Sequence, residues 1–155
     1  MPRMLIRTIE SPIGPLTLAD GTGCGALTAI RFGDEGGADG SAVLVRAQRQ
    51  LEEYFRGERT RFDLPLQPKG TPFQLAVWRA LTEIPYGETA SYGDVARAVG
   101  RPKAVRAVGM ANHCNPIPII VPCHRVIGSD GGLTGYAGGL EIKRALLELE
   151  QKWKR

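Results

Sequence analysis

A proline-rich stretch near the middle of the chain separates two parts whose hydrophobic patterns differ. The segment DLPLQPKGTP, residues 63–72, holds three prolines and one glycine in ten residues. Such a composition favours an extended linker over a helix or a strand. Because the chain has 155 residues, this break predicts two small domains, one over residues 1–66 and one over residues 70–155.

The part before the linker has the pattern of a small sheet backed by a helix. Residues 4–20 alternate apolar and polar side chains on both sides of the SPIG sequence at 11–14, which predicts two strands joined by a turn. A third strand is expected within residues 24–32. After a glycine-rich loop, Ser41 is placed to cap a helix. The apolar side chains of that helix recur at helical spacing, at Leu44, Ala47, Leu51, Tyr54 and Phe55.

The part after the linker has a helical pattern. A helix is expected to begin at Thr71-Pro72 and to continue through residue 84, and a short helix capped by Ser91 is expected to stop at Gly100. A third helix follows over residues 104–114, and a terminal helix over residues 140–153. Two short helices joined by a tight turn with glycine are typical of a helix-turn-helix. The fold class predicted for the whole chain is therefore mixed α+β.

The charge of the chain favours a polyanionic partner. The formal net charge is +4, and residues 97–106 carry three arginines and one lysine with no acidic residue among them. A cationic stretch of this length is also compatible with an ordinary solvated face. The charge alone leaves both readings open.

Cysteine usage indicates a reducing compartment. The three cysteines are an odd number, and no basic and then apolar signal pattern stands at the N-terminus. No apolar run reaches the roughly 18 residues that a membrane helix needs. We therefore expect a cytoplasmic protein with free thiols and no membrane partner. Free cysteine is often buried, and we interpret Cys24 and Cys114 as packing residues.

The third cysteine stands in a different chemical setting. Pro122 precedes Cys123, and His124 and Arg125 follow it, so that a base and a permanent cation are close in sequence. These neighbours suit a thiolate that attacks an electrophile. A cysteine hydrolase that uses His113 as its base is an alternative. A zinc site is disfavoured, because the adjacent His-Cys pairs depart from the usual ligand spacing.

Longer motifs resemble one family of DNA repair proteins. PCHRV at residues 122–126 is similar to the active-site motif of the O6-alkylguanine-DNA alkyltransferases. The similarity extends over GETASYGDVA at 87–96, over residues 104–150 and, more weakly, over SPIGPLTLA at 11–19. The resemblance implies a ribonuclease H-like N-terminal domain of sheet and helix. It also implies a helical C-terminal domain of the winged-helix type that holds both the active site and the DNA-binding elements.

The resemblance assigns catalytic roles to five residues. It implies that Cys123 accepts the alkyl group, that His124 acts as its base through a water, and that Glu150 orients the imidazole. Asn115 would hold the turn between the recognition helix and the active-site segment. Tyr92 would donate a proton to the departing purine and would also contact DNA. No cofactor and no metal are implied.

The resemblance also places the helix at 104–114 in the minor groove of double-stranded DNA. Arg106 would fill the space of a nucleotide flipped out of the duplex. Small side chains would permit close approach to DNA at Ala107, Gly109 and Ala111. A pocket for the alkylated guanine is expected from Val126, Leu133, Thr134, Gly135, Tyr136 and Ala137.

The same family suggests how the protein works as a whole. We expect a monomer that reacts once with O6-alkylguanine, and that also acts on O4-alkylthymine, with cooperative binding to DNA left open. The structural zinc site of some members is not expected, because Cys24 is the only cysteine and no histidine occurs before His113. An alkyltransferase-like protein that binds damage without repairing it is the other alternative, but such proteins lack the reactive cysteine.

Overall fold

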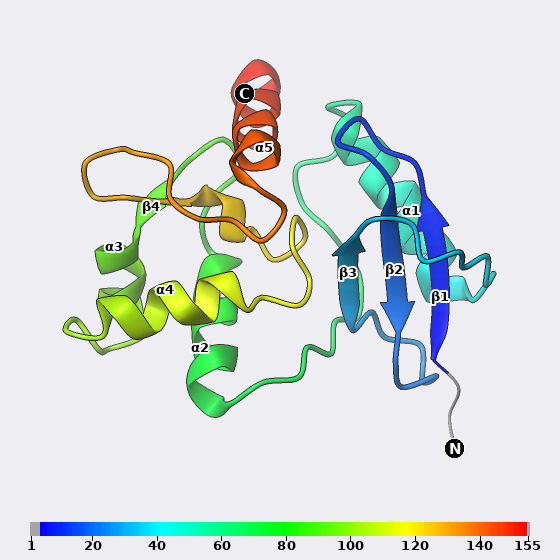
Figure 1. The fold of residues 1–155 in the computed structure, drawn as a ribbon, viewed down its shortest axis with the longest axis horizontal. Helices are drawn as coiled ribbons and strands as arrows, with labels where there is room; N and C mark the ends of the chain where they lie inside the picture. The colour runs from blue at the N-terminus through cyan, green and yellow to red at the C-terminus, as the bar shows by residue number, and fades with distance from the viewer. Residues whose placement is uncertain (1–3, 155) are drawn as a thin grey trace. The chain divides into compact units, whose positions relative to one another are not determined.

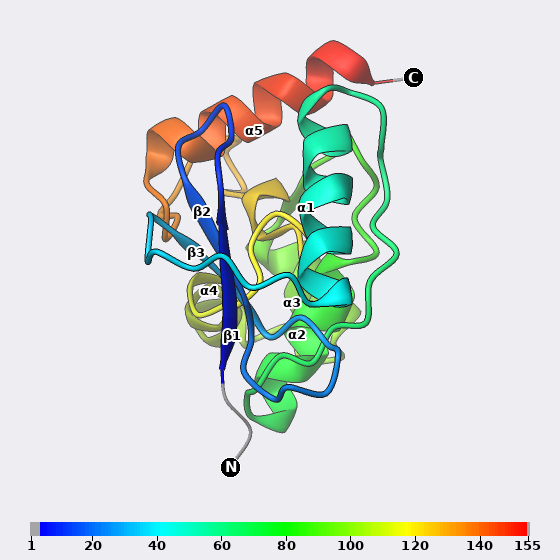
Figure 2. The ribbon, with the colours of Figure 1, turned by 90° about the vertical axis from the view of Figure 1, so that its right-hand side faces the viewer.

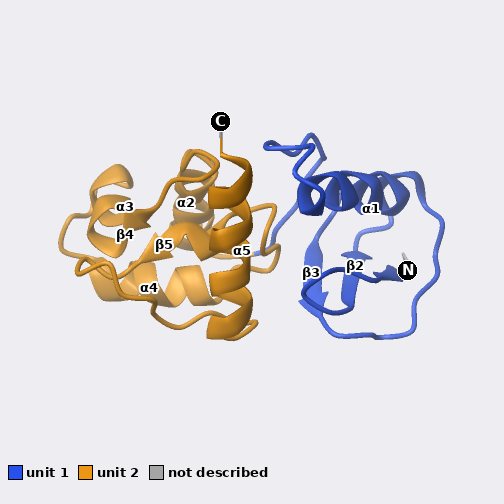
Figure 3. Cartoon of the chain, turned by 90° about the horizontal axis from the view of Figure 1, so that it is seen from above, with its two compact units in different colours: residues 1–69 blue, residues 70–155 orange. Residues whose placement is uncertain are grey.

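The computed structural model describes residues 4–154. The two predicted domains also include residues 1–3 and 155, which lie outside the described residues. The chain divides into two compact units, residues 1–69 and residues 70–155 (Figure 3). The division falls within the proline-rich linker. Within the described residues, no helix is long and apolar enough to cross a membrane.

Unit 1 is built on an antiparallel sheet with the strand order β1-β2-β3 (Figure 1). The strands are β1 (Leu5–Ile9), β2 (Leu16–Asp20) and β3 (Ala29–Phe32). The expected turn joins β1 to β2, where the Ser11 hydroxyl donates a hydrogen bond of 2.6 Å to the Gly14 carbonyl. Gly14 has a φ of 102°, a conformation that glycine adopts without strain.

The third strand begins later than residue 24. The buried carboxylate of Asp20 accepts hydrogen bonds from the backbone N–H groups of Thr22, Gly23 and Gly25, all at 2.9 Å. These bonds fold residues 20–25 into a loop. The chain is therefore extended as a strand only from Ala29.

One helix, α1 (Ala42–Phe55), covers one face of this sheet (Figure 2). Its expected apolar stripe is buried at Leu44, Ala47, Leu51 and Tyr54, which fill the core of unit 1. Ser41 does occupy the N-cap position, but its hydroxyl makes no capping hydrogen bond, so the predicted cap is wrong in its chemistry. Packing of the apolar face, rather than the cap, stabilises this helix.

Unit 2 opens with α2 (Pro72–Leu81), which begins where the sequence predicts. Thr71 and Gln74 form a reciprocal capping box at its start. The helix ends three residues earlier than predicted, because turns follow in which the N–H of Ile84 bonds to the Leu81 carbonyl. The buried indole of Trp78 donates a hydrogen bond of 2.8 Å to the Ala111 carbonyl and so joins α2 to α4.

The helix-turn-helix consists of α3 (Tyr92–Ala98) and α4 (Val105–His113). Ser91 caps α3 in a second capping box, and Gly100, at a φ of 76°, reverses the chain between the helices. The strands β4 (Ala90–Ser91) and β5 (Val126–Ile127), which no sequence pattern predicted, form a short parallel pairing. This pairing brings the first residue of α3 next to the strand that follows Cys123.

The chain ends with α5 (Leu140–Trp153), whose bounds agree with the predicted helix. Lys143, Leu146 and Glu150 are its buried side chains. Residues three, four or seven apart lie on one face of a helix, so these three side chains share the face that packs into unit 2.

Candidate active site

Cys123 and His124 lie in one turn of 3-10 helix, η1 (Cys123–Arg125), which leads directly into β5. All three side chains of this turn are buried. The Nε2 atom of His124 lies 2.7 Å from Oε2 of Glu150 on α5, which is 26 residues away in the sequence. The structure therefore brings together the cysteine, the histidine and the glutamate that the resemblance singled out.

Arg125 has a role that the sequence analysis did not assign. Its guanidinium contacts both carboxylate oxygens of Glu150, with Nε 2.8 Å from Oε1 and a terminal nitrogen 3.0 Å from Oε2. A third nitrogen donates a hydrogen bond of 2.7 Å to the Ile84 carbonyl. The predicted cation beside the thiol is therefore bound to the glutamate instead, in the bidentate geometry that suits arginine.

These contacts fix the protonation of His124. Burial alone would raise the pKa of the Glu150 carboxyl, but the hydrogen bonds and charges of His124 and Arg125 outweigh it and lower this pKa to about 2. Glu150 is therefore a carboxylate that accepts the Nε2–H of His124. Burial lowers the pKa of His124, so its imidazole is neutral near pH 7. The lone pair is then on Nδ1, which has no hydrogen-bond partner within residues 4–154.

Cys123 is not a ready thiolate in this environment. Burial raises the pKa of its thiol to about 11, against the opposing effects of the Asn115 side chain, the Lys143 ammonium and Tyr136. The expectation that neighbouring groups favour the thiolate is thus wrong for the resting protein, because desolvation is the larger effect. At pH 7 roughly one thiol in ten thousand is ionised. A base must remove the proton during the reaction.

Asn115 braces the turn that leads from α4 to the active-site segment. Its side chain donates a hydrogen bond of 2.8 Å to the Val121 carbonyl and accepts one of 3.0 Å from the N–H of Ile117. Asn112, one turn earlier, donates a weaker bond of 3.4 Å to the carbonyl of Cys123 itself. These amides hold the backbone on which the thiol stands.

Lys143 is a buried residue of the site that the sequence analysis missed. Its ammonium donates hydrogen bonds of 2.6 Å to the Val126 carbonyl and 3.1 Å to the Thr134 carbonyl. It therefore links the strand after Cys123 to the glycine-rich loop at residues 128–139, which leads into α5. Its spacing of seven residues from Glu150, on the same face of α5, was the signal that could have revealed it.

The expected pocket residues lie in β5 and in the loop at residues 128–139, and their exposures differ. Val126 and Tyr136 are buried, and Tyr136 forms a hydrogen bond with the Cys123 thiol. Leu133 is half-buried, whereas Thr134, Gly135 and Ala137 are exposed. The Tyr92 hydroxyl lies 2.5 Å from Oγ1 of Thr134, which joins the start of α3 to this loop.

The outer face of α4 carries only part of the predicted DNA contact. Arg106 and Ala107 are exposed, and Gly109 is half-buried beside the Tyr92 ring. Ala111 is only 3% exposed and faces the interior of unit 2. Its predicted place on the DNA-binding surface is therefore wrong, because residue 111 falls on the opposite side of the helix from Arg106.

The other two cysteines differ from expectation. Cys24 and Cys114 are both exposed, so their interpretation as buried packing residues is wrong. Cys24 lies in the loop that Asp20 organises, and Cys114 caps the C-terminal end of α4. Across residues 4–154, no three His, Cys, Asp or Glu side chains gather closely enough to hold a metal ion.

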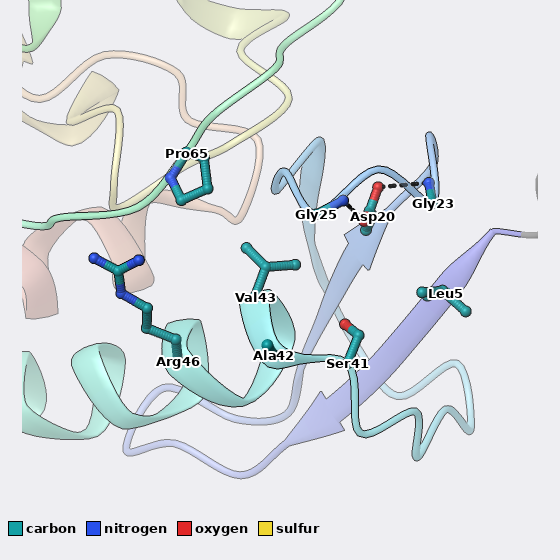
Figure 4. Close-up of a pocket in the computed structure, with 9 residues that line it drawn as sticks. All are labelled: Leu5, Asp20, Gly23, Gly25, Ser41, Ala42, Val43, Arg46 and Pro65. Atoms are coloured by element: carbon teal, nitrogen blue, oxygen red, sulfur yellow. Dashed lines mark hydrogen bonds between the residues drawn. The ribbon is translucent and has the colours of Figure 1, made fainter.

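A cavity of 290 Å³ belongs to unit 1 (Figure 4). Asp20 and Arg46 are the charged residues of its lining, and the Asp20 carboxylate is turned toward the N–H groups of Gly23 and Gly25. Arg46 is paired with Asp63 at 2.9 Å. The Asp20 carboxylate is thus bound by backbone N–H groups and the Arg46 guanidinium by Asp63. The lining also contains no cysteine or histidine, so this cavity has no residue that could act as a nucleophile of the kind found at Cys123.

Two family models together match nearly the whole chain. Residues 4–68 match the ribonuclease-like domain of 6-O-methylguanine DNA methyltransferase, and residues 72–152 match its DNA binding domain. The chain belongs to the methylated-DNA–protein-cysteine methyltransferase family. The predicted fold class, with a small N-terminal sheet domain and a helical C-terminal domain, is confirmed.

Individual methyltransferases of this family are similar over nearly their full length. A methylated-DNA–protein-cysteine methyltransferase of Methanosarcina acetivorans is 52% identical over 153 residues, which cover 95% of this chain and 98% of the relative. One from Mycobacterium tuberculosis is 55% identical over 152 residues, covering 94% and 91% of the two chains. The crystal structure of M. tuberculosis OGT in complex with DNA has a TM-score of 0.88 and 53% identity, and covers 96% of this chain and 93% of that chain.

Proposed function

We propose that the chain repairs DNA by transferring a methyl or larger alkyl group from O6 of guanine to Cys123. The observation that carries this proposal is the buried His124–Glu150 pair, whose Nε2 and Oε2 atoms lie 2.7 Å apart, at the residue that directly follows the buried Cys123. The similarity of the chain to methyltransferases, including one in complex with DNA, supports the same reading.

The transfer is a displacement at carbon. The bond from the alkyl carbon to O6 breaks, and a bond from that carbon to the sulfur of Cys123 forms. His124 takes the thiol proton on Nδ1, directly or through a water, and Tyr92 gives a proton to the purine as the negative charge develops there. Return of a proton from His124 to the Tyr92 phenolate through solvent then restores both groups, so that the net change moves the thiol proton to the purine. The products are guanine and an S-alkyl cysteine.

His124 has to act at the moment of transfer because the resting thiol is protonated. With the pKa of Cys123 at about 11, forming the thiolate at pH 7 costs about 5 kcal/mol. The imidazolium formed on His124 is stabilised by the Glu150 carboxylate at 2.7 Å. The thiol therefore stays mostly protonated in the resting protein, and its proton passes to His124 as the bond to the alkyl carbon forms.

The expected mode of DNA binding follows from the exposed face of α4. The damaged base lies inside the duplex and has to be flipped out, at a cost of a few kcal/mol. Arg106 is exposed on α4 and is free to enter the minor groove and fill the vacated space. We further propose that the protein acts as a monomer in the cytoplasm.

Chemistry limits each molecule to one reaction. An S-alkyl thioether offers no easy hydrolytic release, so the modified cysteine stays modified. No cofactor is needed, since the damaged DNA itself supplies the alkyl group. O4-alkylthymine carries a similar alkyl ether, and we include it as a second substrate.

Intact mass measurement tests this function. Incubation with duplex DNA that contains O6-methylguanine should add one methyl group per protein molecule, on the peptide that holds Cys123. Cys123→Ser should remove this gain, whereas Cys114→Ser, at an exposed cysteine, should leave it intact. Tight binding of the damaged duplex without modification would instead favour a damage-binding protein. Repeated turnover of an ester would favour a hydrolase.

A further inference from the structure

The most exposed large apolar side chain in the described part of the molecule lies on the helix assigned to DNA. Met110 on α4 is 66% exposed, more than any other large hydrophobic residue of residues 4–154. Arg106 precedes it by four residues and His113 follows it by three, and both are exposed as well. At 100° per residue, these three side chains form one stripe along the outer face of α4.

The surroundings of this stripe match a polyanion. The sequence contains no acidic residue between Asp94 and Asp130. Arg101 and Lys103, in the turn just before α4, are both exposed. An acidic protein partner would bring carboxylates to this cationic surface. Those carboxylates would then surround the apolar Met110 side chain, which is an unfavourable environment for it. It suits DNA, where phosphates line the rims of a groove and apolar sugar faces form its walls.

We propose that Met110 is an apolar contact to the deoxyribose walls of the minor groove, one helical turn from Arg106. This inference rests on the proposed function. It adds a second contact residue on α4, which together with Arg106 would fix the orientation of this helix in the groove. Methionine suits this contact because its unbranched, polarizable side chain adapts to an irregular apolar surface. The neighbouring positions Ala107 and Gly109 carry little or no side chain, so Met110 and Arg106 project furthest from this part of the helix.

An apolar contact and a cationic contact differ in their dependence on salt. Each phosphate that a cation neutralises releases counterions, so Arg106→Ala should lower the slope of log affinity against log salt by about 0.9. Met110→Ala should weaken binding to duplex DNA about ten-fold and leave that slope unchanged. Met110→Gln, which keeps the length but not the apolar character, should behave like Met110→Ala, whereas Met110→Leu should bind nearly as the wild type does.

The experiment measures duplex affinity at several salt concentrations, together with the rate of reaction with free O6-benzylguanine. The proposal predicts an unchanged rate with the free base for all Met110 variants, because Met110 does not contact Cys123. Val45→Ala, at a 45% exposed position on α1, is the matched control and should change neither measurement. Wild-type affinity in Met110→Ala, a changed salt slope, or an equal loss with the free base would each overturn the proposal. A failure of the proposed function would appear separately, as wild-type protein that does not take up the methyl group.

Discussion

Replacing Glu150 by glutamine tests the charge at the centre of the site while preserving its shape. In the wild type, the pKa of this carboxyl falls from its ordinary value of 4.5 to about 2, through its contacts with His124 and Arg125. At about 1.4 kcal/mol per pKa unit, the difference corresponds to about 3 kcal/mol of stability at pH 7. Loss of one partner from a buried ion pair costs a similar amount, about 3–5 kcal/mol.

The pH dependence gives this prediction its sign. A carboxyl with a lowered pKa stabilises the fold above pH 4.5, and this contribution is lost as the pH falls toward 2. Urea unfolding should therefore show Glu150→Gln about 3 kcal/mol less stable than wild type at pH 7, and the difference should shrink between pH 4.5 and 2. Glu148→Gln, at an exposed position of the same helix, is the control. A difference that stays constant over that range would mean that packing, not charge, sets the cost.

Three further predictions concern the rate of transfer and the stability of the fold. Tyr92→Phe should slow alkyl transfer about 100-fold in rapid-quench assays, because it removes the hydroxyl that acts as general acid. Duplex affinity should stay within about two-fold of wild type, because the variant keeps the aromatic ring that is expected to contact DNA; unchanged transfer would remove Tyr92 from the chemistry. Because burial lowers the pKa of His124 below its usual 6.5, the transfer rate should be constant from pH 8 to about 6.5 and fall on further acidification, as Nδ1 becomes protonated; a decline that begins above pH 7 would contradict this assignment. Lys143→Met leaves two backbone carbonyls without their donor and should lower the unfolding free energy by about 2 kcal/mol in urea titrations, with partial recovery in Lys143→Arg; a Lys143→Met protein of wild-type stability would show that the ammonium does not hold the loop.

Local patterns predicted the helices well, because each carries its own signals in the sequence. The capping residues Thr71 and Ser91 stand at the starts of α2 and α3, and the amphipathic stripe of α5 ends where predicted. The pairing of β4 with β5 was missed because two strands of two residues each have no pattern to detect. Their pairing depends on contacts between segments that are more than 30 residues apart.

In the candidate site, the sequence motifs predicted which residues take part but not the contacts and burial that the fold gives them. The resemblance selected Cys123, His124 and Glu150, which the fold brings together. It did not reveal that Arg125 binds Glu150 or that burial raises the pKa of Cys123, because both depend on which groups share the interior. Ala111 was misplaced for the opposite reason, since a small side chain suits either face of a helix.

The raised pKa of the buried Cys123 thiol has a consequence for the protein before it meets damage. Oxidants and stray electrophiles in the cell react with thiolates, and they do so in proportion to thiolate content and accessibility. Cys123 is 4% exposed and almost fully protonated, whereas Cys24 and Cys114 are open to solvent. Under the single reaction per molecule proposed above, any other electrophile that modified Cys123 would end the usefulness of the protein. The same burial that makes the thiol difficult to ionise therefore protects it from such side reactions.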